Sequence, residues 1–168
     1  LLVTGDYGMG KTMLCLILVR LIEKKKNIPL VYLPTPMLSF EKIINTLAER
    51  LGINVPLNAV DHTLAALCSY YKNRSVSQEA YIIIDDAQEL AVPTLASLRG
   101  LANFNHNGFF PFRVVFFAHT SFSALLKTGP LIALDQRIKR RHQLQPFDFQ
   151  GTKEYIYFRL YKSCAPGT

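Results

Sequence analysis

The chain has 168 residues, of which 49% are hydrophobic, and a formal net charge of +7 at pH 7. This length and apolar content suit one α/β domain with a sizeable core rather than two full domains. No apolar run reaches the roughly 18 residues that a membrane span needs, and no charged-then-apolar leader opens the chain. The positive charge suits anionic partners, which are nucleotides, nucleic acid or anionic lipid, without choosing among them.

The most informative segment follows a short apolar run at residues 1–3, which we expect to be a strand, and precedes an apolar helix over residues 13–22. It reads GDYGMGKT and fits the pattern GxxxxGK[ST]. Glycines let a backbone turn tightly enough for its N–H groups to surround phosphates, and the following helix points the positive end of its dipole at them. We therefore predict a nucleoside triphosphate site made by Gly5, Asp6, Tyr7, Gly8, Met9, Gly10, Lys11 and Thr12.

Two residues of this loop have distinct expected roles. Lys11 should reach the β and γ phosphates, and the Thr12 hydroxyl should bind Mg²⁺. The alternative is a glycine-rich turn without a ligand, which would require the constrained positions to coincide by chance.

The remaining elements can be predicted in chain order. A second buried strand over residues 28–33 should end at Pro34-Thr35-Pro36, because proline cannot continue a central ladder. Ser39 should cap a helix that ends at Gly52, and Asp61 should start another. Apolar periodicity and turn signals then predict strands over residues 81–84, 114–118 and 141–145, and helices over residues 92–104 and 151–161.

Strands that alternate with helices predict a parallel sheet of about five strands flanked by helices. Together with the phosphate loop, this predicts the α/β fold of a P-loop NTPase, in a single domain over residues 1–168. Because the chain begins inside its first strand, we expect residues upstream of it to be missing. We expect truncation at the other end as well, and a membrane anchor outside this segment stays open. Cys15, Cys68 and Cys164 are widely spaced, which predicts reduced, mostly buried thiols in a cytosolic protein.

Two acidic residues, Asp85 and Asp86, follow the apolar strand at residues 81–84. Ligands of an open α/β sheet gather beyond the carboxyl ends of its strands, where this pair should meet the phosphate loop. We expect Asp85 to hold the magnesium shell and Asp86 to orient or deprotonate the attacking water. The alternative is that both only cap a turn. Aspartate is one methylene shorter than the glutamate common in the second role, which leaves open slow hydrolysis or binding without turnover.

Three segments carry a family resemblance: residues 5–12, the run IIIDDAQEL at residues 82–90, and LDQRI at residues 134–138 followed by LQPF at residues 144–147. They resemble the AAA+ ATPases of the general secretion pathway A type, which are similar in turn to transposition-helper ATPases. The resemblance covers essentially the whole chain and implies an AAA+ core without its small helical lid. Such proteins typically have D-E-A-Q where this chain has D-D-A-Q, so Asp86 is a departure that bears on the hydrolysis rate.

The resemblance implies further site residues. Arg137 matches the arginine that in AAA+ rings projects into the neighbouring subunit's ATP site, and the alternative is an ordinary surface arginine. His119, or Thr120 beside it, stands at the strand tip where a sensor residue touches the γ-phosphate or the water, and the alternative for His119 is a loop or capping role. Thr35 would hydrogen-bond Asp86 and hold it away from the water.

The resemblance also implies an ATP-binding and ATP-hydrolysing switch, with ATP and Mg²⁺ as ligands, that forms homo-oligomers when full length and acts on a protein partner in envelope secretion. It would work in the cytoplasm, free or tethered to the inner membrane through regions outside this chain. A nucleotide-dependent interaction module with little turnover is one alternative. A DNA-associated regulator of transposition is another. It is motivated by a basic cluster, for which we favour a solvated or subunit-facing role. The cluster comprises Arg137, Lys139, Arg140, Arg141 and His142.

Overall fold

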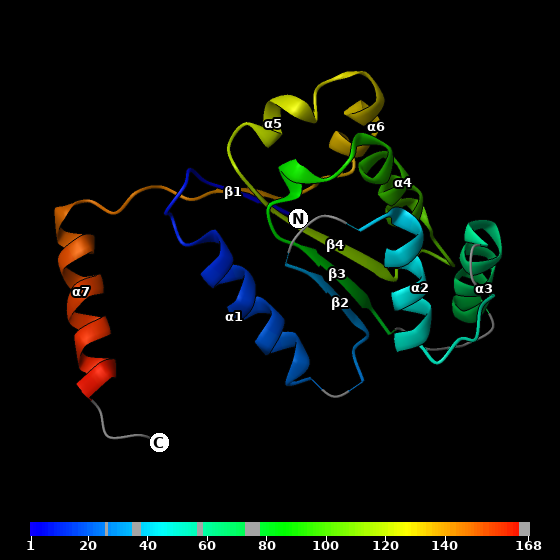
Figure 1. The fold of residues 1–168 in the computed structure, drawn as a ribbon, viewed down its shortest axis with the longest axis horizontal. Coiled ribbons are helices and arrows are strands. Elements are labelled where there is room, and N and C mark those ends of the chain that lie inside the picture. The colour runs from blue at the N-terminus through cyan, green and yellow to red at the C-terminus, as the bar shows by residue number, and fades with distance from the viewer. Residues whose placement is uncertain (26, 35–37, 57–58, 73–77, 165–168) are drawn as a thin grey trace.

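The computed structural model describes residues 1–25, 27–34, 38–56, 59–72 and 78–164. Five parallel strands form one sheet in the spatial order β2-β3-β4-β1-β5 (Figure 1). Their bounds are β1 Leu2–Thr4, β2 Leu30–Leu33, β3 Ala80–Ile84, β4 Phe112–Ala118 and β5 Arg141–Gln143. The predicted fold class and parallel sheet are confirmed, and each strand starts and ends within two residues of its predicted bounds.

Helices cover both faces of this sheet. They are α1 Lys11–Glu23, α2 Phe40–Arg50, α3 Val60–Lys72, α4 Val92–Asn103, α5 Phe122–Leu125, α6 Ile132–Asp135 and α7 Phe149–Cys164, with short 3-10 turns η1 Ala87–Glu89 and η2 Gly129–Leu131. Because side chains alternate along a strand, Ile83 packs on the α1 side while Ile82 and Ile84 pack on the side of α2, α3 and α4. This burial on both faces explains the unbroken apolar run in β3.

The local signals at the ends of α2 act as predicted. The Ser39 hydroxyl accepts a hydrogen bond from the Lys42 N–H at 3.3 Å, which satisfies one of the free donors at the helix start. Gly52, just after the helix, has a φ of 69°, a conformation that glycine adopts without a side-chain clash.

Two features after β4 differ from the sequence prediction. The short elements α5, η2 and α6 between β4 and β5 were not predicted, because pieces of three or four residues are too short for helical periodicity. Helix α7 is longer than predicted, and of residues 149–163 all but Gly151 are exposed. In Figure 1 this orange-red helix stands apart from the sheet, on the α1 side.

Within the described residues, the apolar helix α1 is covered on one face only. Its inner face, with Cys15 and Val19, is buried against the sheet, whereas Met13, Ile17 and Leu21 on its outer face are 43%, 46% and 54% exposed. Of the thiols predicted to be buried, Cys15 is buried and Cys68 is half-buried, while the Cys164 side chain lies outside the described residues. Among the described helices, none combines the length and apolar character that crossing a membrane requires.

Candidate nucleotide site

The predicted phosphate loop joins the carboxyl end of β1 to the start of α1. Gly8 and Gly10 have φ values of 80° and 78°, a left-handed conformation that side chains disfavour, and a Cβ added at either glycine would meet nothing within 4 Å. Open space therefore faces the loop at both positions. The first N–H groups of α1 lack intrahelical acceptors, as at any helix start, so they are available to an anion.

Lys11 is folded back onto this loop. Its side chain is buried, its Nζ donates a hydrogen bond to the Asp6 carbonyl oxygen at 2.9 Å, and the same ammonium lies 5.6 Å from the centre of the Tyr7 ring. A carbonyl and an aromatic face carry only partial negative charge, so the ammonium lacks a full counter-charge in these contacts. A phosphate in the loop would provide that charge.

The two acids occupy the predicted place at the end of β3. Asp85 is buried, with an exposed fraction of 1%, and its Oδ1 accepts the Asp86 N–H at 3.1 Å. Its own N–H donates to the Leu33 carbonyl at 3.0 Å, which continues the ladder between β2 and β3. Asp86 has a φ of 47° and precedes η1, but its side chain makes no capping hydrogen bond there. Turn capping therefore does not account for the Asp86 side chain.

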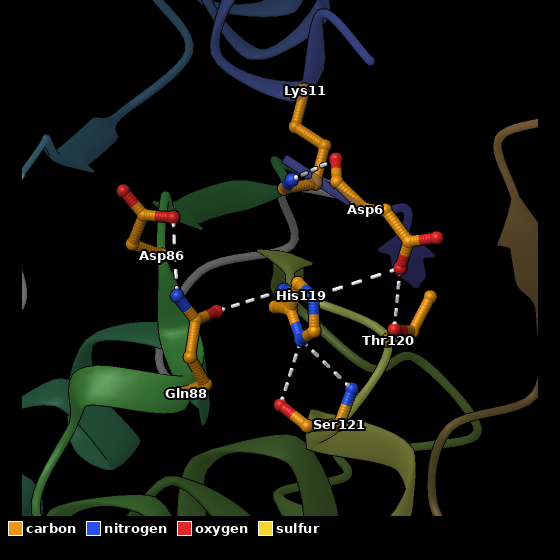
Figure 2. Close-up of polar contacts among 7 residues, drawn as sticks. All are labelled: Asp6, Lys11, Asp86, Gln88, His119, Thr120 and Ser121. Atoms are coloured by element: carbon orange, nitrogen blue, oxygen red, sulfur yellow. Dashed lines mark hydrogen bonds and ion pairs between the residues drawn. The ribbon is translucent and has the colours of Figure 1, made fainter. Parts of the chain in front are cut away.

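The tip of β4 lies between the phosphate loop and the acids, because β4 separates β1 from β3 in the sheet. Figure 2 shows how residues from three segments meet there. The Thr120 hydroxyl donates to Asp6 Oδ1 at 2.7 Å, and the His119 Nε2 lies 3.6 Å from the same oxygen. The His119 ring also stacks on Tyr7 with centroids 4.6 Å apart. The predicted sensor position thus touches the phosphate loop directly.

The same strand tip also reaches the second acid through Gln88. The His119 N–H donates to Gln88 Oε1 at 2.9 Å, and Gln88 Nε2 donates to Asp86 Oδ1 at 3.2 Å (Figure 2). No role was predicted for Gln88 from the sequence, since it was only the last letter of a motif. The available signal was its place two residues after Asp86 in a tight turn.

The buried thiol of Cys15, in α1, is close enough to the two acids to feel their charge. Burial, together with the nearby negative charge of Asp85, raises the pKa of Cys15 to about 12. Burial also raises the pKa of Tyr32 to about 12, with smaller contributions from Cys15 and Asp85. Cys15 is therefore a neutral packing residue of α1 at physiological pH, and its raised pKa gives it no reactive thiolate.

The basic cluster lies on the surface near the edge strand β5. Arg137, Lys139, Arg140 and His142 are exposed, and Arg141 forms an ion pair with Asp135 at 2.9 Å. The exposure of Arg137 is compatible with either role considered for it. Thr35, the remaining residue named as a candidate, lies outside the described residues.

Comparison with known proteins agrees with this geometry. The family described as AAA domain matches residues 1–126. The chain belongs to the AAA domain family. General secretion pathway protein A of Aeromonas hydrophila is 26% identical, and the alignment covers 95% of this chain and 29% of that protein. The resemblance noted in the sequence is confirmed, and the AAA domain described here spans less than a third of that relative's length.

Solved structures share the fold of this AAA domain. The crystal structure of Cdc6p from Pyrobaculum aerophilum has a TM-score of 0.71 and 23% identity, covering 96% of this chain and 42% of that one. The Aeropyrum pernix ORC1 protein, solved in complex with DNA, has a TM-score of 0.64 and 13% identity, covering 96% and 43%. At these identities the likeness establishes the fold, and the chain spans less than half of each structure.

Proposed function

We propose that this AAA domain binds ATP with Mg²⁺ at the phosphate loop and hydrolyses it. One observation carries the proposal. Within the described residues, Lys11 and Asp85 are the two charged side chains that are buried, and neither belongs to an ion pair there. Burying an unpaired charge is expensive, so each needs a partner of opposite sign. A magnesium–triphosphate complex supplies both partners, since its phosphates are anionic and its metal is cationic.

The chain's residues divide the work as follows. The loop amides and Lys11 hold the phosphates, while Thr12 and Asp85 are the residues to hold Mg²⁺, which neutralises phosphate charge. Asp86 orients the water that attacks the γ-phosphorus and accepts its proton as the bond to ADP breaks. The ADP and phosphate products then leave the site. Because Asp86 is shorter than glutamate, turnover should be slow.

We further propose that ATP controls the assembly of this domain and its action on a protein partner in secretion. The support is the resemblance to general secretion pathway protein A across 95% of the chain. Arg137 is exposed and available to a neighbouring subunit, where its charge would stabilise the transition state in trans. His119 and Thr120 touch the phosphate loop, a position from which they would sense the γ-phosphate.

The experiment that tests nucleotide and metal binding compares ATP affinity with Mg²⁺ and with a chelator. Wild type should bind ATP more tightly with Mg²⁺, and Asp85→Asn should lose most of that difference because its amide is a weak metal ligand. Asp61→Asn, which removes an exposed carboxylate at the start of α3, is the matched control and should keep the difference. Wild-type affinity that does not respond to Mg²⁺ would refute the metal site.

A DNA-associated role in transposition is the second candidate, and one observation favours it. Three cationic residues of the basic cluster, Arg137, Lys139 and Arg140, are exposed with no ion-pair partner among the described residues. Exposed cations of this kind suit phosphate backbones. We rank this candidate second because exposed cations alone do not distinguish a nucleic acid from another anionic partner, and Lys139 already lies against the ring of Phe110, at 5.9 Å.

A further inference from the structure

Gln88 uses both ends of its side-chain amide. The His119 backbone N–H is a fixed donor, so the amide oxygen must face it, and the amide nitrogen is left to face Asp86. The two hydrogen bonds measure 2.9 Å and 3.2 Å. Gln88 is half-buried, so water competes only partly for these contacts. One side chain therefore ties the second acid to the tip of β4.

The Asp86 backbone and the Asp86 carboxylate are held by different contacts. The backbone φ of 47° and ψ of 43° place the residue in the left-handed region, which aspartate enters more readily than most other non-glycine residues. Its N–H is held by Asp85 Oδ1 at 3.1 Å, which anchors the backbone but not the carboxylate. The contact that fixes the carboxylate in the described residues is the one from Gln88 Nε2.

The tip of β4 is itself fastened to the phosphate loop. Thr120 donates to Asp6 Oδ1, the His119 ring stacks on Tyr7, and the Ser121 N–H donates to His119 Nδ1 at 3.2 Å, which holds the ring in place. A continuous set of contacts thus runs from the loop, through the strand tip, to Asp86 (Figure 2). The tip of β4 is the segment that contacts both the phosphate loop and Gln88.

We propose that Gln88 is a positioning residue of the ATPase site: its amide fixes the Asp86 carboxylate relative to the tip of β4, and hence to the phosphate loop. Gln88 itself need not touch nucleotide or water. The inference rests on the proposed function, because it assigns Gln88 a part in the hydrolysis that Asp86 performs. A short aspartate has little reach of its own, so loss of its tether should move the carboxylate by enough to slow the reaction.

The test is a set of steady-state rates and ATP affinities for the full-length protein. Gln88→Ala removes both hydrogen bonds and should lower kcat about 10- to 100-fold, while the Kd for MgATP changes less than about twofold. Glu89→Gln is the matched control, because Glu89 lies in the same turn and its side chain is exposed. The substitution removes a charge but keeps the backbone hydrogen bond from the Glu89 N–H to the Asp86 carbonyl, at 2.9 Å. Its kcat should stay near that of wild type.

Gln88→Glu adds a readout that a merely structural role would not move. The introduced carboxylate still accepts the His119 N–H, but it cannot donate to the Asp86 carboxylate and repels it. The kcat of Gln88→Glu should therefore fall at least as far as that of Gln88→Ala, whereas a role confined to holding the tip of β4 would leave kcat near that of wild type.

Two results would overturn the proposal: an unchanged kcat in Gln88→Ala beside an active wild type, or an equal loss in Glu89→Gln. A Gln88→Glu variant with the kcat of wild type would also count against it. If wild type binds MgATP but does not hydrolyse it, the hydrolysis part of the proposed function fails first, and the role of Gln88 fails with it. The wild-type measurement alone separates these two failures.

Discussion

Replacing Lys11 with alanine is the sharpest test of the phosphate site. In the free protein the Lys11 ammonium donates to the Asp6 carbonyl at 2.9 Å and is otherwise buried near the Tyr7 ring. When ATP binds, the same ammonium should turn to the β and γ phosphates, because hydrogen bonds to charged acceptors are stronger than those to a carbonyl. The variant removes this charge while the glycine turns of the loop stay intact.

The structure sets the size of the effect. Two charge-assisted hydrogen bonds to phosphate contribute about 3–6 kcal/mol at about 1.5–3 kcal/mol each. The contact with Asp6 that Lys11 gives up on binding also involves the charged ammonium, so it offsets about 1.5–3 kcal/mol of this. The net loss is about 1.5–3 kcal/mol, which corresponds to a Kd for MgATP that rises about 10- to 150-fold.

Isothermal titration calorimetry with MgATP measures this change directly, with circular dichroism to confirm that the variant is folded. Lys24→Ala is the matched control, because Lys24 is an exposed cation at the other end of the same helix. Its Kd should change less than about twofold, since an exposed charge more than a Debye length from the loop is screened. A folded Lys11→Ala variant with the Kd of wild type would remove the loop from the mechanism.

The remaining predictions concern the acid, assembly, DNA and the buried thiol. Asp86→Asn should keep MgATP binding and lose turnover in a phosphate-release assay, and equal rates in wild type and variant would exclude Asp86 as the residue that activates water. Hydrolysis per subunit should rise with protein concentration in wild type but not in Arg137→Ala, and a variant that keeps the rise would point to another arginine. Affinity for duplex DNA should be weak. If binding is measurable, neutralising Lys139 and Arg140 should flatten the plot of log affinity against log salt concentration, and tight binding at physiological salt would favour the transposition role. Folding favours the protonated Cys15 thiol, whose pKa is raised from 9.0 to about 12, so its contribution to stability is complete below pH 9.0 and is lost as the pH rises toward 12. The free energy of unfolding should thus fall more steeply over that range in wild type than in Cys15→Ala, and parallel curves would show that the thiol titrates alike in both states.

The phosphate loop and the strand ends were predictable because their chemistry is local. Glycines at fixed spacing before Lys11 and Thr12 define a backbone turn by themselves, and the structure gives Gly8 and Gly10 the expected positive φ values. The acidic pair was also within reach of the sequence, since carboxylates after an apolar strand must appear at one edge of a parallel sheet. The roles proposed for these residues remain predictions for the experiments above.

The tether through Gln88 was decided by tertiary structure alone. It depends on β4 lying between β1 and β3, an order that no sequence pattern specifies. The His119 N–H and Gln88 are 31 positions apart, and Thr120 and Asp6 are 114 positions apart, so neither contact leaves a periodic signal. Only the folded sheet brings the tip of β4 against side chains from the phosphate loop and from the turn after β3. These contacts decide which way the Gln88 amide points and which carboxylate its nitrogen reaches. The sequence determined which groups the site would contain, and packing of the sheet determined which of them touch, because hydrogen bonds form only between groups that the fold brings within about 3 Å of each other.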